Sequence, residues 1–132
     1  MQGLQTVWNL PKEGYSWATA GYMGAIASGR TTCGLLIGSS IAIGLKCGQG
    51  KEGIPEVNET ERDKAISSVN YIYREFLKEF GDSECKNLIK CDFSNPDDYN
   101  RYVQNKVWKE TCDVFLSFIM RKCVEMSNAG KL

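Results

Sequence analysis

Apolar residues recur every three or four positions between residues 65 and 80, a spacing typical of one face of an α-helix. Asn58 and Glu61 form an N-x-x-E pattern that predicts a capping box at the start of this helix, and Gly81 predicts its end. No stretch of the chain shows the sustained alternation of apolar and polar residues that is typical of a half-buried strand. The chain is therefore expected to be all-α.

A second segment, residues 32–46, is apolar on nearly every side, which predicts the buried central helix of a compact bundle of about five helices. Gly34 and Gly38 are four residues apart in this segment and so share a face. Glycine inside a helix costs roughly 1 kcal/mol relative to alanine. We therefore expect another part of the chain to approach these two glycines closely. Thr31 or Thr32 is expected to cap the helix.

Shorter helical patterns fill the rest of the chain. They predict a closely packed helix over residues 15–28, a short helix capped by Ser83 that holds Cys85, a further turn that starts at Asn95 and Pro96, and a C-terminal helix whose apolar stripe runs from Trp108 to Met126. Tyr99 and Tyr102 are interpreted as packing residues.

The length of 132 residues fits one domain, predicted over residues 15–132, with residues 1–14 as an N-terminal arm. The arm carries the apolar residues Leu4, Val7, Trp8 and Leu10, which need a surface to lie on. Together with the glycine-lined central helix, an exposed arm of this kind favours self-association. We therefore expect a homodimer.

Charge and histidine content exclude several functions. Sixteen basic residues balance sixteen acidic ones, so the chain lacks the basic excess of a nucleic-acid-binding protein. It contains no histidine, which excludes a c-type haem attachment motif, a Ser–His or Cys–His catalytic pair and a histidine metal ligand. The most apolar stretch, residues 35–45, is too short to span a membrane, and residues 1–14 do not form an export signal. A cytoplasmic protein with reduced cysteines is expected.

Any metal or redox chemistry must then use the carboxylates, a bound cofactor or the thiols of six cysteines, at positions 33, 47, 85, 91, 112 and 123. They include no C-x-x-C pair, so neither a zinc ribbon nor a thioredoxin motif is present. Cys112 and Cys123 share a predicted helix but lie roughly 16 Å apart along it. Any site must therefore gather cysteines from different helices. Cys123, on the apolar stripe, is expected to be a core residue.

Several motifs around these cysteines occur together. They are Cys33-Gly34-Leu35-Leu36-Ile37-Gly38, Gly44-Leu45-Lys46-Cys47-Gly48, Phe80-Gly81-Asp82-Ser83-Glu84-Cys85 and Lys109-Glu110-Thr111-Cys112. In order, spacing and helix context, the chain over roughly residues 21–126 resembles the bacterial and archaeal redox-active proteins named for their C-GCAxxG-C-C cysteine pattern. Two differences stand out: Leu35 replaces the family's alanine, and no cysteine precedes Cys33.

The resemblance implies a redox-active protein that uses Cys33, Cys85 and Cys112, with an iron–sulfur cluster or other thiolate-bound metal and electron transfer to a redox partner protein. A site of four thiolates would need Cys47, Cys91 or a second subunit.

Two alternatives stay open, and with them the question of whether the chain is an enzyme. One is a thiol oxidoreductase with Cys33 as nucleophile, since the start of a helix favours the thiolate and Arg30 is nearby in sequence. The other is a non-catalytic dimerisation module with structural cysteines.

Overall fold

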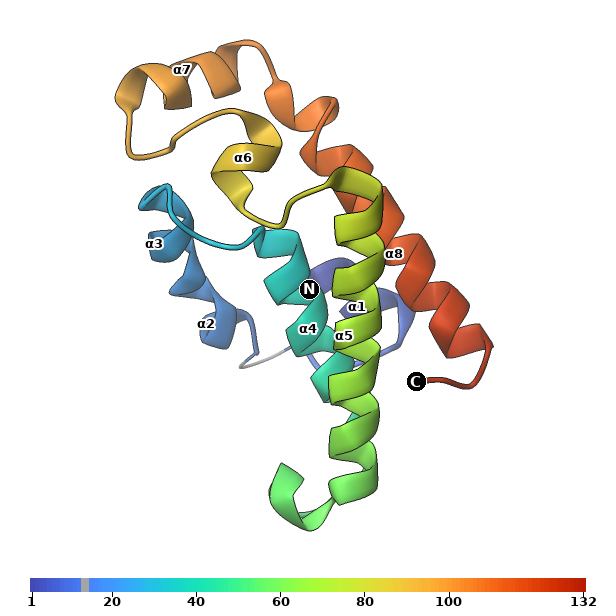
Figure 1. The fold of residues 1–132 in the computed structure, drawn as a ribbon. Coiled ribbons are helices and arrows are strands. Elements are labelled where there is room, and N and C mark those ends of the chain that lie inside the picture. Colours follow the sequence, from blue (N-terminus) through green and yellow to red (C-terminus); the bar gives the residue numbers. More distant parts are fainter. Residues whose placement is uncertain (13–14) are drawn as a thin grey trace.

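Three long helices form the centre of the molecule in the computed structural model, which describes residues 1–12 and 15–132 (Figure 1). They are α4 (Gly34–Cys47), α5 (Glu59–Phe80) and α8 (Cys112–Asn128). The shorter helices are α1 (Gln2–Val7), α2 (Tyr15–Ala20), α3 (Tyr22–Ala27), α6 (Cys85–Ile89) and α7 (Pro96–Gln104), with 3₁₀ turns η1 (Pro55–Val57) and η2 (Val107–Lys109). The described residues contain no strand, which confirms the all-α prediction, although the bundle is divided into more and shorter helices than the five expected. None of these helices is long and apolar enough to cross a membrane.

Helix α4 occupies the centre, packed against α1, α5 and α8. Its side chains Leu36, Ala42 and Ile43 are fully buried, as the apolar pattern predicts. Both motif glycines are in close contact with other parts of the chain. A Cβ at Gly38 would lie 3.0 Å from the backbone nitrogen of Met1, and one at Gly34 would lie 2.8 Å from Cδ1 of Ile26. The predicted close approach to these glycines is confirmed.

Helix α5 ends as predicted but begins differently. Gly81 closes it in the left-handed conformation, with φ of 80°. The capping box is wrong: the Asn58 side-chain amide instead donates to the carbonyl oxygens of Glu52 and Ile54, at 2.8 and 3.1 Å. Glu61 forms an ion pair with Lys51 at 3.0 Å. The preceding loop folds back on the helix start and binds both side chains that the capping box requires.

An isolated antiparallel bridge joins Thr32 to Glu84, and it changes two predicted caps. The bridge holds Thr32 in extended backbone, so the N-cap of α4 is Cys33 rather than a threonine. On the other side, the N-cap of α6 is Glu84 rather than Ser83. Asp82 supports this turn, since its Oδ1 accepts the backbone N–H groups of Ser83 and Glu84 at 2.6 and 2.8 Å.

The N-terminal segment is part of the core and not an exposed arm. It forms helix α1, which packs against α4 and α8. Leu4, Trp8 and Leu10 are buried, and of the four apolar residues only Val7 is exposed. The surface these side chains need is supplied by the same chain, so the argument for self-association from an exposed arm is wrong. The homodimer itself stays a prediction.

Residues 15–28 form two short helices, α2 and α3, instead of one. The glycines at 21 and 24 lower helix propensity here. The Tyr22 hydroxyl bonds Thr31 Oγ1 and donates to the Thr32 carbonyl oxygen, at 2.5 and 2.8 Å. Trp17 on α2 is 84% exposed, so close packing of this whole segment is also wrong.

The C-terminal part follows the predicted pattern with one shift. Asn95 caps α7 by accepting the Asp97 N–H at 2.9 Å, with Pro96 in the first turn. Helix α8 begins at Cys112, because the segment around Trp108 forms the separate 3₁₀ turn η2. The buried stripe of α8 is Phe115, Phe118, Ile119, Cys123 and Met126.

Replacing Gly29 by alanine is expected to destabilise the fold more than the same change at Gly81. Both glycines have positive φ, 69° and 80°, so alanine at either position costs roughly 1–2 kcal/mol of backbone strain. At Gly29 the new Cβ would also collide with the Asp92 carboxylate, whereas nothing lies within 4 Å at Gly81. Urea denaturation of both variants measures the difference. Equal losses of unfolding free energy would contradict the contact between Gly29 and Asp92.

Candidate functional site

Three cysteines from three different helices line one cavity of about 810 Å³. Cys33 is the N-cap of α4, Cys85 is the first residue of α6, and Cys112 is the first residue of α8. The cavity lies at the end of the bundle where these helices begin, and α3, α6 and α7 gather there (Figure 1). The structure thus brings together the three cysteines that carry the family resemblance.

The wall of the cavity is apolar. It includes Met23 and Ile26 from α3, Leu88 from α6, and Phe93 from the loop before α7. Tyr99 and Tyr102 of α7 complete one side, and no charged residue is among the described residues of the lining. A ligand that enters this cavity exchanges water for hydrocarbon and aromatic surface.

The isolated bridge fixes the relative position of Cys33 and Cys85. The Cys33 N–H donates to the Ser83 carbonyl oxygen at 2.7 Å, and the Cys85 N–H donates to the Thr31 carbonyl oxygen at 2.9 Å. Cys33 and Cys85 each follow a bridge residue, and both side chains line the cavity.

Burial in this apolar cavity raises the pKa of two of its thiols, Cys85 and Cys33, and so keeps them protonated. It raises the pKa of Cys85 to about 12, and charge on Cys33, Cys112 and Cys91 raises it further in that order. Burial also raises the pKa of Cys33, although the backbone N–H groups of Leu35 and Leu36 oppose this. The expected lowering of the Cys33 pKa at a helix start is therefore wrong in direction, because loss of hydration outweighs the helix N–H groups.

Cys112 has a hydroxyl neighbour in the cavity wall. Tyr102 Oη lies 3.4 Å from Cys112 Sγ, within hydrogen-bonding distance of sulfur. Burial raises the pKa of Tyr102, and the contact with Cys112 raises it further. The Tyr102 ring is fixed by Phe93 and Trp108, with ring centroids 4.8 and 5.6 Å away. Sequence reasoning assigned Tyr99 and Tyr102 to packing alone, and their i, i+3 spacing on α7 was the signal that they share a face.

A family model described as "Putative redox-active protein (C_GCAxxG_C_C)" matches residues 1–126 of this chain. The chain belongs to this family. Comparison with curated proteins and with solved structures gives no significant match.

Cys91 and Cys47 of this C_GCAxxG_C_C protein lie in different places. Cys91 is buried next to the cavity: it contributes charge to the pKa of Cys85, and Arg101 Nη2 lies 3.7 Å from its sulfur. Cys47 is at the opposite end of α4, where burial raises its pKa, and it does not line the cavity. Of the two less favoured candidates, the structure brings only Cys91 close to the other three.

Cys123 is fully buried in α8, so its prediction as a core residue is confirmed. All six cysteines of this family member are free thiols in the structure.

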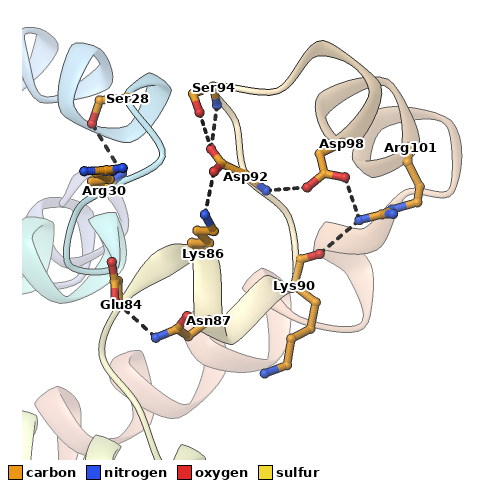
Figure 2. A network of polar contacts seen from close by, with 10 residues as sticks. All are labelled: Ser28, Arg30, Glu84, Lys86, Asn87, Lys90, Asp92, Ser94, Asp98 and Arg101. Carbon is orange, nitrogen blue, oxygen red and sulfur yellow. Dashed lines mark hydrogen bonds and ion pairs between the residues drawn. The ribbon is translucent and has the colours of Figure 1, made fainter.

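A polar network holds the outer wall of the cavity in place (Figure 2). Arg101 donates to the Lys90 carbonyl oxygen at 3.0 Å and pairs with Asp98 at 3.0 Å. Asp98 accepts the Asp92 N–H at 2.8 Å, and Asp92 pairs with Lys86 at 2.6 Å. The hydrogen bond from Lys86 is the main reason that the pKa of Asp92 falls to about 2. These bonds fix the loop that carries Cys91 and Phe93 against α6 and α7.

In the described parts of this family member, no three cysteine, aspartate or glutamate side chains are grouped as a metal ion requires. The iron–sulfur cluster or other thiolate-bound metal stays a prediction. The two-thiol pair at the bridge is the simplest chemical unit that the cavity contains.

Proposed function

We propose that this protein is a thiol-based redox protein in which Cys33 and Cys85 convert between a dithiol and a disulfide. The observation that carries the proposal is the shared cavity. Three cysteines far apart in the sequence line it, and two backbone hydrogen bonds beside the Thr32–Glu84 bridge hold the segments that carry Cys33 and Cys85 together. Membership of a family described as redox-active supports the same conclusion.

The reaction balances as a two-electron exchange. Oxidation breaks the two S–H bonds and forms one S–S bond, and it releases two electrons and two protons. A two-electron acceptor that enters the cavity receives them: a disulfide leaves as two thiols, or a quinone leaves as a hydroquinone. Reduction by a dithiol reverses the step.

Closure requires a small backbone movement. Diagonal neighbours on paired extended segments have Cα atoms roughly 7–8 Å apart. A disulfide joins Cα atoms roughly 4.4–6.8 Å apart. The segments that carry Cys33 and Cys85 must therefore approach each other by about 2 Å. Each is a loop residue or a first helical residue, so this movement leaves the long helices in place.

Cys85 is the cysteine that the proposed disulfide requires. Burial raises its pKa to about 12, and charge on Cys33, Cys112 and Cys91 raises it further, so these three sulfurs are its neighbours. Cys112 is bonded to Tyr102 and is the third thiol, available to exchange with a mixed disulfide. A cytoplasmic location and a redox partner protein that restores the dithiol belong to this proposal as well.

The experiment equilibrates the protein without oxygen in mixtures of reduced and oxidised dithiothreitol, alkylates the remaining thiols and maps the peptides by mass spectrometry. We expect a Cys33–Cys85 disulfide that forms and disappears reversibly with the mixture. Cys85→Ser should abolish it, whereas Cys47→Ser, a matched change at a buried cysteine outside the cavity, should leave it intact. No disulfide at any mixture, or a Cys85–Cys112 disulfide in its place, would overturn the assignment.

The iron–sulfur cluster stays an alternative that rests on the family's cysteine pattern. Its ligands would be Cys33, Cys85 and Cys112, with Cys91 as the fourth sulfur beside them. Iron and sulfide analysis of protein purified without oxygen decides this alternative. The inert-module alternative predicts that Cys33→Ala changes stability and nothing else.

A further inference from the structure

The cavity selects its ligand first by charge. No charged side chain is among its described lining residues, so a charged group brought inside would lose its water with no ionic partner. Peptides with free carboxylates and nucleotides with phosphates are therefore poor ligands. The volume of about 810 Å³ lies within the range of cavities that hold small organic molecules.

The cavity selects secondly for a flat ring. Phe93 contacts the Tyr102 ring edge-to-face at 4.8 Å and the Tyr99 ring at 5.9 Å. Phe115 lines the cavity as well, so aromatic edges and faces are available on more than one element. Rings of this kind favour an aromatic partner through stacked or edge-to-face contacts.

The cavity selects thirdly for hydrogen-bond acceptors. Apart from the thiols, the side-chain polar groups of the wall are the hydroxyls of Tyr99 and Tyr102. A hydroxyl and a protonated thiol each donate one hydrogen bond. The matching ligand is a neutral ring that carries carbonyl oxygens.

We infer that the cavity binds an uncharged quinone with a fused aromatic ring, which serves as the two-electron acceptor of the Cys33–Cys85 dithiol. This inference rests on the proposed function for its redox step. Two S–H bonds break and one S–S bond forms. The two quinone carbonyls become hydroxyls, so the quinone gains the two electrons and two protons that the dithiol loses. Protonated thiols suit this acceptor, which needs both protons, better than they suit attack on a disulfide, which needs a thiolate.

Binding is tested apart from reaction with the Cys33→Ser/Cys85→Ser double variant, which keeps the cavity and cannot form the disulfide. The probe is 2,3-dimethyl-1,4-naphthoquinone, whose blocked ring positions prevent thiol addition, and titration calorimetry measures its binding. We expect saturable binding at one site, and at least tenfold weaker binding of the same ring with a sulfonate attached. Absent binding, or equal affinity for both rings, would overturn the inference.

Substitutions at two exposed residues test where the quinone binds. Met23, 64% exposed, lines the cavity, and Ile66, 60% exposed, lies on α5 away from it. Met23→Glu in the double-variant background should weaken quinone binding about tenfold by placing a charge in the wall, and Ile66→Glu should not. Equal affinities in these two variants would place the quinone elsewhere and contradict the inference.

The redox step is tested with the reduced wild-type protein and the same neutral quinone under anaerobic conditions. One hydroquinone should form for each Cys33–Cys85 disulfide. Disulfide formation with dithiothreitol but not with the quinone would overturn the inference and leave the proposed function standing. If the double variant binds the quinone but the wild-type protein forms no disulfide with either oxidant, the proposed function is overturned.

Discussion

Replacing Phe76 by alanine is expected to lower the free energy of unfolding by about 3–5 kcal/mol. Phe76 is completely buried at the junction of α5 and α8. Its ring lies 4.7 Å from that of Phe80, 5.6 Å from Phe115 and 6.2 Å from Phe118, in tilted or edge-to-face contacts. Alanine would leave a void where these rings meet, and since Phe115 also lines the cavity, the loss should loosen the wall of the site.

Leu77 provides the matched control, because it is the next residue on α5 and its side chain is 42% exposed. Leu77→Ala should cost less than about 1 kcal/mol. Urea denaturation of the two variants and the wild type gives both values. A loss at Phe76 no larger than that at Leu77 would contradict the packing of α5 against α8.

The fold should lose stability steeply as the pH rises from about 9 towards 12. Burial raises the pKa of Cys85 and of Cys123 to about 12, above the value of 9.0 for a free thiol, and it raises the pKa of Cys33 as well. Below pH 9 both folded and unfolded chains hold these protons, and the contribution to stability is complete. Above it the unfolded chain releases protons that the folded chain retains, so unfolding becomes progressively easier.

Cys123→Ala isolates one part of this effect. The thiol of Cys123 is fully buried, so its raised pKa contributes at most about 4 kcal/mol, a loss that is complete near pH 12. The alanine variant loses packing contacts, and this loss of stability does not depend on pH. Its free energy of unfolding should therefore fall less steeply with pH than that of the wild type. Urea denaturation at a series of pH values measures the two slopes, and parallel slopes would contradict the burial of a protonated thiol at this position.

The long helices could be predicted from sequence because their apolar residues repeat with the period of a helix. The stripe that contains Phe76 on α5 and the all-round apolar character of α4 are local properties of the chain. Caps and helix ends depended instead on contacts between distant segments. Asn58 donates into the preceding loop, and Thr32 pairs with Glu84, and neither partner is marked by a local pattern.

The candidate residues of the site came from sequence motifs, whereas the arrangement of these residues in space could not be predicted. The motifs around Cys33, Cys85 and Cys112 identified the three thiols, and the structure places all three in one cavity. The position of Cys91 beside them could not be predicted, since it depends on the loop that Arg101 holds to α7. The raised pKa of Cys33 could not be predicted either, because burial is a property of the assembled wall and outweighs the local helix start.

In the proposed function, the disulfide beside the Thr32–Glu84 bridge would couple the redox state of the pair to the folding of the whole chain. A disulfide from Cys33 to Cys85 would close a loop of about 50 residues that includes both α4 and α5. In the chain-entropy treatment, this disulfide lowers the conformational entropy of the unfolded chain, which raises its free energy by about 4 kcal/mol. Thermodynamic reciprocity then requires folding to stabilise the disulfide by the same amount, which makes it harder to reduce by about 90 mV than in the unfolded chain.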